Sequence, residues 1–148
     1  MAFRSSLDTL LRVRRGLERQ QELLLQQANA RVATLQQELV RIRSQIDADA
    51  VRELQHLQSG LTAAELHFDL LCRSALFLRR RQIEGELLQA EALREARGQS
   101  FRGARQQREI LETLREQQLA AYRQESDRRD QRRIDDLFLL RRAYLPRA

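Results

Sequence analysis

The sequence predicts an all-α protein in which two long helices form an antiparallel coiled-coil hairpin, the second helix being longer than the first. Apolar residues recur every three or four positions along most of the 148-residue chain, a spacing that only a helix matches. Aromatic residues make up just 5% of the chain and there is one proline, so we do not expect a compact globular core. One clear break, near residue 60, divides the pattern in two.

The first helix is predicted over about 3–58. Its apolar positions follow heptad spacing and predict the seam that faces the second helix. These positions are Phe3, Leu7, Leu10, Leu17, Leu24, Ala28, Val32, Leu35, Leu39, Ile42, Ile46, Ala50, Leu54 and Leu57.

The turn is predicted at about 59–62. Gly60 can adopt the left-handed conformation that ends a helix. Thr62 and Glu65 have the spacing of a capping box, in which each side chain satisfies a backbone N–H at the start of the next helix.

The second helix is predicted over about 62–144, with Pro146 beyond its end. Gly98 and Gly103 predict a soft point or kink, because each glycine costs a helix about 1 kcal/mol relative to alanine. If residue i lies across from roughly residue 121 − i, Leu35 faces the vicinity of Glu86, and we expect poorer packing there. The predicted seam is Ala64, Phe68, Leu71, Ala75 and Leu78, continuing more weakly through Ile83, Leu87, Ala90, Phe101, Leu111 and Leu114.

We expect one domain over 1–148, with an overhang of about twenty residues at the C-terminal end of the second helix. The net charge is +6, and every basic residue is arginine. Residues 1–19 and 137–148 each carry a surplus of three positive charges, whereas 20–136 hold 19 arginines and 19 acids. Since both termini of a hairpin lie at the same end, that end is predicted to be basic.

No enzyme, cofactor or metal site is expected, because neither a phosphate-binding glycine loop nor a catalytic triad pattern occurs. His56 and His67 flank the turn without enough further ligands for a metal. Cys72 is alone, which fits a reducing compartment. With no signal peptide and no spanning apolar run, we expect a cytoplasmic protein, at most peripheral at the inner membrane. Asp135 and Asp136 are read as ion-pairing partners of the arginines before them.

The high isoelectric point makes nucleic-acid binding an alternative function to consider. The densest arginine stretch, 123–136, carries five arginines and five acids, unlike the nearly acid-free basic region of a groove-binding helix. We therefore expect no nucleic-acid partner.

Two stretches go beyond a generic coiled coil. They are Leu7-Asp8-Thr9-Leu10-Leu11-Arg12-Val13-Arg14 near the start and Asp130-Gln131-Arg132-Arg133-Ile134-Asp135-Asp136-Leu137 near the end. Together they resemble the flagellar export protein FliJ family, which has a leucine-rich opening and an acid-Gln-base block followed by two acids near the C-terminus. The family is similar in length and is also a two-helix hairpin.

The resemblance implies a non-enzymatic stalk of the flagellar type III export apparatus. It implies that the open end enters and activates the hexameric export ATPase FliI, and that the shaft contacts the cytoplasmic region of the export gate FlhA. Export chaperones are further implied partners. Alternatives are the stalk of a virulence type III secretion system and a generic coiled-coil scaffold or nucleic-acid-associated protein.

The resemblance also suggests site residues. The candidates for ATPase binding at the open end are Leu7, Leu10, Arg12, Arg14, Gln131, Arg133, Asp135, Leu137 and Phe138. The candidates for gate binding on the middle of the shaft are Glu38, Ile42, Gln45, Asp49, Cys72, Leu76, Arg79 and Ile83. Gln45, Asp49 and Cys72 depart from the family, whose better-known members place aromatic residues at several of these sites.

Overall fold

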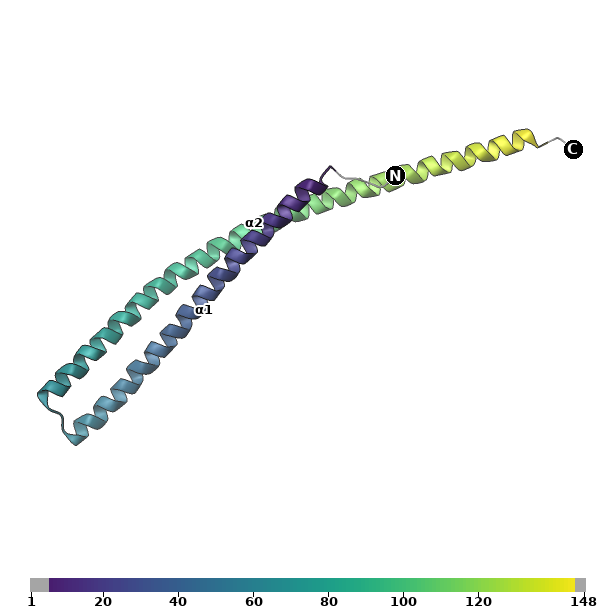
Figure 1. The fold of residues 1–148 in the computed structure, drawn as a ribbon. Helices are drawn as coiled ribbons and strands as arrows, with labels where there is room; N and C mark the ends of the chain where they lie inside the picture. Colours follow the sequence, from purple (N-terminus) through teal and green to yellow (C-terminus); the bar gives the residue numbers. More distant parts are fainter. Residues whose placement is uncertain (1–5, 146–148) are drawn as a thin grey trace. The chain divides into compact units, whose positions relative to one another are not determined.

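A computed structural model describes residues 6–145, which form two α-helices (Figure 1). Helix α1 is Asp8–Ser59, of 52 residues, and helix α2 is Ala63–Tyr144, of 82 residues. The described residues contain no strand. The predicted all-α hairpin with a longer second helix is confirmed. Residues 3–5 of the predicted first helix and Pro146 lie outside the described residues, and 6–7 form a turn before α1.

The chain divides into two compact units, and each helix contributes to both. The turn unit is Gln20–Arg102, and the terminal unit combines Met1–Arg19 with Gly103–Ala148. Each unit is described by itself below.

The turn between the helices follows the sequence prediction. Gly60 has φ of +86°, a conformation that costs a residue with a Cβ about 1–2 kcal/mol. The Thr62 N–H donates to Glu65 Oε2 at 2.9 Å, and the Glu65 N–H donates to Thr62 Oγ1 at 3.3 Å. These reciprocal bonds confirm the capping box, which satisfies N–H groups that the first turn of α2 leaves without helical partners.

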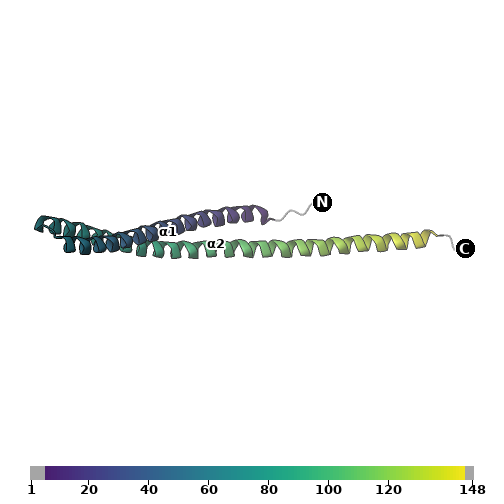
Figure 2. The same ribbon diagram turned by 90° about the horizontal axis from the view of Figure 1, so that it is seen from below.

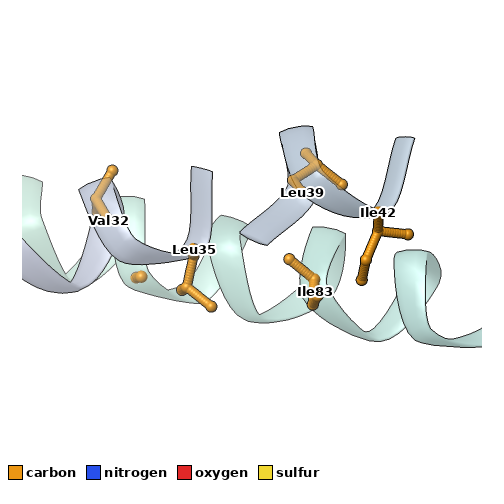
Figure 3. Close-up of a cluster of buried hydrophobic side chains, with 6 residues drawn as sticks. Val32, Leu35, Leu39, Ile42 and Ile83 are labelled. Carbon is orange, nitrogen blue, oxygen red and sulfur yellow. The ribbon is translucent and has the colours of Figure 1, made fainter. Parts of the chain in front are cut away.

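The core of the turn unit lies in the middle of the paired helices (Figure 3). Leu35 is 1% exposed and Ile83 is 0% exposed, and Ile46 and Leu87 pack against the same cluster. The prediction of poor packing near Leu35 was therefore wrong. Figure 3 shows the Ile83 side chain pointing up toward α1, so an isoleucine on α2 fills the place where the sequence estimate put a charge. The buried members of the cluster are Val32, Leu35, Leu39, Ile42, Ile83 and Ala90.

Ion pairs between α1 and α2 lie on both sides of this core and show the antiparallel register. Arg31 pairs with Glu86 at 2.9 Å, and Arg79 pairs with Glu38 at 3.5 Å. Arg43 pairs with Glu84 at 3.5 Å. All three agree with the predicted register to within two turns of helix, and exposed pairs of this kind contribute only about 0–1 kcal/mol each.

The predicted seam was wrong near the turn. Phe68, Leu71 and Leu78 are 66%, 57% and 61% exposed. Arg73 of α2 instead forms an ion pair with Glu53 of α1, and both side chains are largely covered. The seam near the turn is set by the regular geometry of the helix. Because Ile83 faces α1, the positions that also face α1 toward the turn are 80, 76, 73 and 69, even though polar residues occupy some of them. On α1, Leu54 and Leu57 are likewise exposed.

Helix α2 continues without a break through the predicted soft point between Gly98 and Gly103. Gly98 is buried beside α1, and a Cβ built on it lies 4.0 Å from Leu25 Cδ1. A Cβ at this position would therefore make only ordinary van der Waals contacts, so the packing against α1 does not require glycine here.

In the terminal unit, the first turns of α1 pack on α2 through a mostly polar seam. Leu11 is the buried residue, 3% exposed, whereas Leu10 and Leu17, which the sequence placed in the seam, are 43% and 40% exposed. Figure 2 shows the two helices from a second direction. The predicted seam differs here for the same reason as near the turn. The heptad positions that bury Val32 and Leu39 lead back along α1 to Leu11 and not to Leu10.

Candidate partner-binding surfaces

Charged side chains join α1 to α2 in the terminal unit. Arg15 donates to Glu112 at 3.0 Å, and Arg108 binds both Glu18 and, at 2.5 Å, Glu112. The hydrogen bond from Arg15 is the main cause that lowers the pKa of Glu112 below its ordinary value of 4.5. The hydrogen bond to Glu18 raises the pKa of Arg108. Arg115 donates to Asp8, the first residue of α1, at 2.6 Å.

We call residues 127–145 the C-terminal segment. Every residue in it is exposed, which confirms the predicted overhang of about twenty residues. The polar residues of its Asp130–Leu137 motif interact with one another along the helix. Gln131 donates to Asp135 at 3.0 Å, and Arg133 lies 3.9 Å from Asp130. Such pairs three or four residues apart support an isolated helix by about 0.2–0.5 kcal/mol each.

Large apolar side chains form a stripe along the C-terminal segment. Ile134, Leu137 and Phe138 are 60%, 66% and 64% exposed, and Tyr144 and Leu145 continue the same face at helical spacing. An exposed apolar stripe of this kind is characteristic of a helix that binds a groove of another protein. Leu139 is equally exposed, at 61%, but lies on the opposite side of the helix.

The predicted ATPase-binding residues lie in two places within the terminal unit. The group at the start of the chain, Leu7 and three residues of α1, lies beside 107–115 of α2, where Arg14 donates to Gln107 at 2.5 Å. Gln131 is sixteen residues beyond Arg115, about 24 Å further along α2 at 1.5 Å per residue. Leu7 and Arg14 are half-buried, whereas Leu10, Arg12, Gln131, Arg133, Asp135, Leu137 and Phe138 are exposed.

The two basic ends are therefore not joined in one patch. Arg141 and Arg142 lie about 39 Å or more beyond Arg115 along α2, whereas the described arginines of 12–19 lie beside the α1–α2 contact. Both surpluses belong to the terminal unit, as the sequence predicts, and the overhang of α2 separates them along the helix.

The gate-binding candidates are divided between a groove and the core. Ile42 and Ile83 are 8% and 0% exposed and hold the helices together. Glu38 is engaged with Arg79 across the helices at 3.5 Å. The remaining candidates share one open groove of about 540 Å³ on the turn unit. Its lining is Gln45, Asp49, Arg52, Cys72, Ala75, Leu76 and Arg79.

Sequence reasoning missed Arg52 and Ala75 in this groove. Arg52 donates to Asp49 at 2.5 Å, which orients the guanidinium at the groove wall. Heptad spacing could have identified Arg52 as a groove residue. Positions 38, 45 and 52 are seven residues apart and therefore lie on the same side of the α1 seam, and positions 72 and 79 share one side of the α2 seam in the same way.

Within residues 6–145, no group of three or more histidine, cysteine, aspartate or glutamate side chains is arranged to hold a metal ion. Neither described helix has an apolar stretch long enough to cross a membrane. Cys72 is exposed with a free thiol.

Two long antiparallel helices packed along a narrow seam define a coiled-coil protein. The chain belongs to the FliJ family: the family model described as Flagellar FliJ protein matches residues 3–145, nearly its whole length. This assigns it to the flagellar type III export machinery and agrees with the resemblance carried by the two terminal motifs. No curated protein and no solved structure matches the chain.

Proposed function

We propose that this protein is the stalk that binds and activates the hexameric flagellar export ATPase FliI, and that the C-terminal segment makes the main contact. The observation that supports the proposal is the apolar stripe of Ile134, Leu137 and Phe138 on a helix with every residue exposed. An apolar wall of the ATPase ring along this one face of the helix would remove the stripe from water.

The terminal +3 surplus supports electrostatic attraction to an acidic ring opening. Arg141 and Arg142 lie in the last turn of α2, exposed and beside the stripe. Arginine forks bind carboxylates in a bidentate manner, so these residues orient the helix end within the ring. The candidates near the start of the chain lie more than 20 Å back along α2 and would contact the ring only at its rim. They are Leu7, Leu10, Arg12 and Arg14.

The test of this proposal is ATP hydrolysis by the flagellar ATPase of the same organism, with and without this protein. We expect the wild-type protein to stimulate hydrolysis and hexamer formation, and the variant Leu137→Gln/Phe138→Gln to lose most of both. Leu139→Gln is the matched control, since Leu139 is equally exposed on the opposite side of the same helix. Equal loss in both variants, or no binding by the wild type, contradicts the assignment.

We further propose that the turn-unit groove contacts the cytoplasmic region of the export gate FlhA, which would place the protein at the cytoplasmic face of the inner membrane. The groove offers charged walls from Asp49, Arg52 and Arg79 around the small apolar residues Ala75 and Leu76. This mixed lining suits a polar peptide segment better than an aromatic anchor. Export chaperones are further proposed partners of the shaft.

The gate contact can be tested through the single cysteine. A bulky maleimide attached to Cys72, which lines the groove and is exposed, is expected to block binding of the gate's cytoplasmic region while helicity is unchanged. A control label at Leu54→Cys in a Cys72→Ser background leaves the groove open. If the Cys72 label has no effect on gate binding, the groove is not the contact.

A further inference from the structure

The inner seam of the turn unit becomes polar between its core and the turn. None of the residues between Ile42 and Ile83 is fully buried. Glu53 and Arg73 form a half-buried ion pair across the helices, and Arg80 Nε is buried without a hydrogen-bond partner within residues 6–145. Burying charged groups costs free energy that an ion pair offsets only in part. The observed seam is therefore held weakly near the turn.

A second line of side chains, largely apolar, runs beside this polar seam on each helix. Both lines start at the core and advance toward the turn in steps of four residues and finally three, from Ile42 on α1 and from Ile83 on α2. Their large apolar members near the turn are 54% to 66% exposed. The lines are Ile46, Ala50, Leu54 and Leu57 on α1, and Arg79, Ala75, Leu71 and Phe68 on α2.

Near the turn, the two lines lie one residue away from the observed seam, in opposite directions along the chain. Leu54 follows Glu53, whereas Phe68 precedes Asp69, and one residue corresponds to about 100° around a helix. Because the helices are antiparallel, these offsets place the two lines on opposite sides of the pair. Turning both helices by about 100° in the same sense therefore brings both lines inward.

The winding of a coiled coil permits this rotation without breaking either helix. A step of four residues in place of three relaxes the left-handed supercoil locally. The steps of four from Ile42 to Leu54 and from Ile83 to Leu71 spread the rotation between the core and the turn. The packing of Ile83 in the buried cluster is the starting point of both seams and is kept.

The two lines lie at matching levels, so each can cover the other without sliding of the helices. The ion pairs of Arg79 with Glu38 and of Arg43 with Glu84 bracket the level at which Ala50 lies across from Leu71. In a second seam formed by these lines, apolar side chains leave water while the charges of the polar seam enter it. The observed seam retains an ion pair and a regular supercoil, so neither seam is strongly favoured.

We propose that the turn end of the hairpin alternates between these two seams about the fixed core. The groove belongs to the observed seam, because the rotation carries Gln45 away from α2 and Cys72 toward α1. Exchange of the seams therefore forms and removes the groove. Its effect on gate binding rests on the proposed gate contact, whereas the two seams are a property of the chain by itself.

The first test uses the native Cys72 as the common partner of two single substitutions. Gln45 and Cys72 line the same groove, so Gln45→Cys reports the observed seam. Ala50 is seven residues after Arg43 and lies on the opposite side of the pair, so Ala50→Cys reaches Cys72 only in the second seam. With a short bifunctional thiol reagent at low protein concentration, we expect an intramolecular link in both proteins, located by peptide mass mapping.

The second test removes the apolar line. Leu54→Gln/Leu71→Gln is expected to lower the Ala50–Cys72 link at least fivefold and to leave the Gln45–Cys72 link unchanged. Val51→Gln/Leu70→Gln is the matched control, because Val51 and Leu70 are 55% and 47% exposed but belong to neither seam. Circular dichroism of each variant establishes that both helices persist.

The third test reverses one charge of the polar seam. Arg73→Glu places two carboxylates together in the observed seam but leaves them in water in the second. We expect the Ala50–Cys72 link to increase at least threefold and the Gln45–Cys72 link to decrease. Glu53→Arg/Arg73→Glu restores the ion pair and should restore the wild-type ratio, and it controls for the effect of the new charge on the neighbouring thiol.

Absence of the Ala50–Cys72 link in Arg73→Glu overturns the proposal, as does loss of helicity in that variant, since a second seam would keep the helices folded. Equal yield of the link in Leu54→Gln/Leu71→Gln, or an equal decrease in the control variant, also overturns it. All links are measured in the isolated full chain, so these outcomes hold whether or not the gate binds the groove.

Discussion

Arg115 Nε donates a hydrogen bond to Asp8 Oδ1 at 2.6 Å, and Asp8 is the residue at which α1 begins. The bond joins the first residue of one helix to a point well inside the other. The part of α2 that follows Arg115 therefore extends past the start of α1. The proposed ATPase contact lies in this part of α2. The C-terminal segment begins twelve residues after Arg115 and is exposed throughout.

Removing residues 130–148 is expected to leave the unfolding midpoint nearly unchanged, since the described residues of that stretch add only exposed helix. The change in free energy of unfolding should stay within about 0.5 kcal/mol, as for surface changes away from packed contacts. Stimulation of the ATPase should be lost. Thermal unfolding followed by circular dichroism, together with the hydrolysis assay, checks both halves; retained stimulation would move the ATPase contact elsewhere.

Ile83→Ala is expected to destabilise the turn unit strongly. Ile83 is 0% exposed within the apolar cluster, and truncating such a side chain costs about 2–5 kcal/mol. Leu78→Ala, at a position 61% exposed, should cost less than about 1 kcal/mol. Urea unfolding of the two variants measures the difference. Similar losses at both positions would mean that Leu78, as the sequence pattern suggested, lies in the seam.

Two glycine substitutions are expected to have opposite signs. Gly60→Ala places a Cβ at φ of +86° and should destabilise the hairpin by about 1–2 kcal/mol. Gly85→Ala adds a Cβ with no heavy atom within 4 Å in the interior of α2, and should stabilise by about 0.5–1 kcal/mol. Thermal unfolding midpoints of both variants test this. A stabilising Gly60→Ala would contradict the left-handed turn.

Acid is expected to loosen the contact between α1 and α2 in the terminal unit. The pKa of Glu112 is lowered below 4.5 by its bond from Arg15, so the ionised form stabilises the folded contact. That stabilisation is present above the unfolded pKa and is lost as pH falls through the lower folded pKa. Spin labels at Thr9 and Leu114 should therefore separate below pH 4.5 in the wild type.

Glu112→Gln provides the control for this pH dependence. The amide cannot ionise, so its variant should show a weaker contact at neutral pH and a smaller further change in acid. A label separation that is identical in wild type and variant across the acid range would assign the effect to other carboxylates.

The sequence by itself determined the hairpin, because helical period, Gly60 and the Thr62–Glu65 capping box are local features that act within a few residues. The two sequence motifs near the ends of the chain were likewise sufficient to indicate the FliJ family. The tertiary structure decided which face of each helix turns inward. Leu54, Leu57 and Phe68 fit a heptad as well as Leu35 and Ile42 do, so the sequence pattern could not separate them.

Only the packing of Ile83 against Leu35 and its neighbours fixed the rotation of both helices. Once fixed there, the rotation carries along a rigid helix, which places Glu53 and Arg73 between the helices and turns the leucines near the turn outward. The same rigidity separates the C-terminal segment from the arginines of α1. The spacing of apolar side chains is a property of a single helix and can be read from the sequence. Which of the possible apolar faces becomes the seam depends on how the two helices pack together.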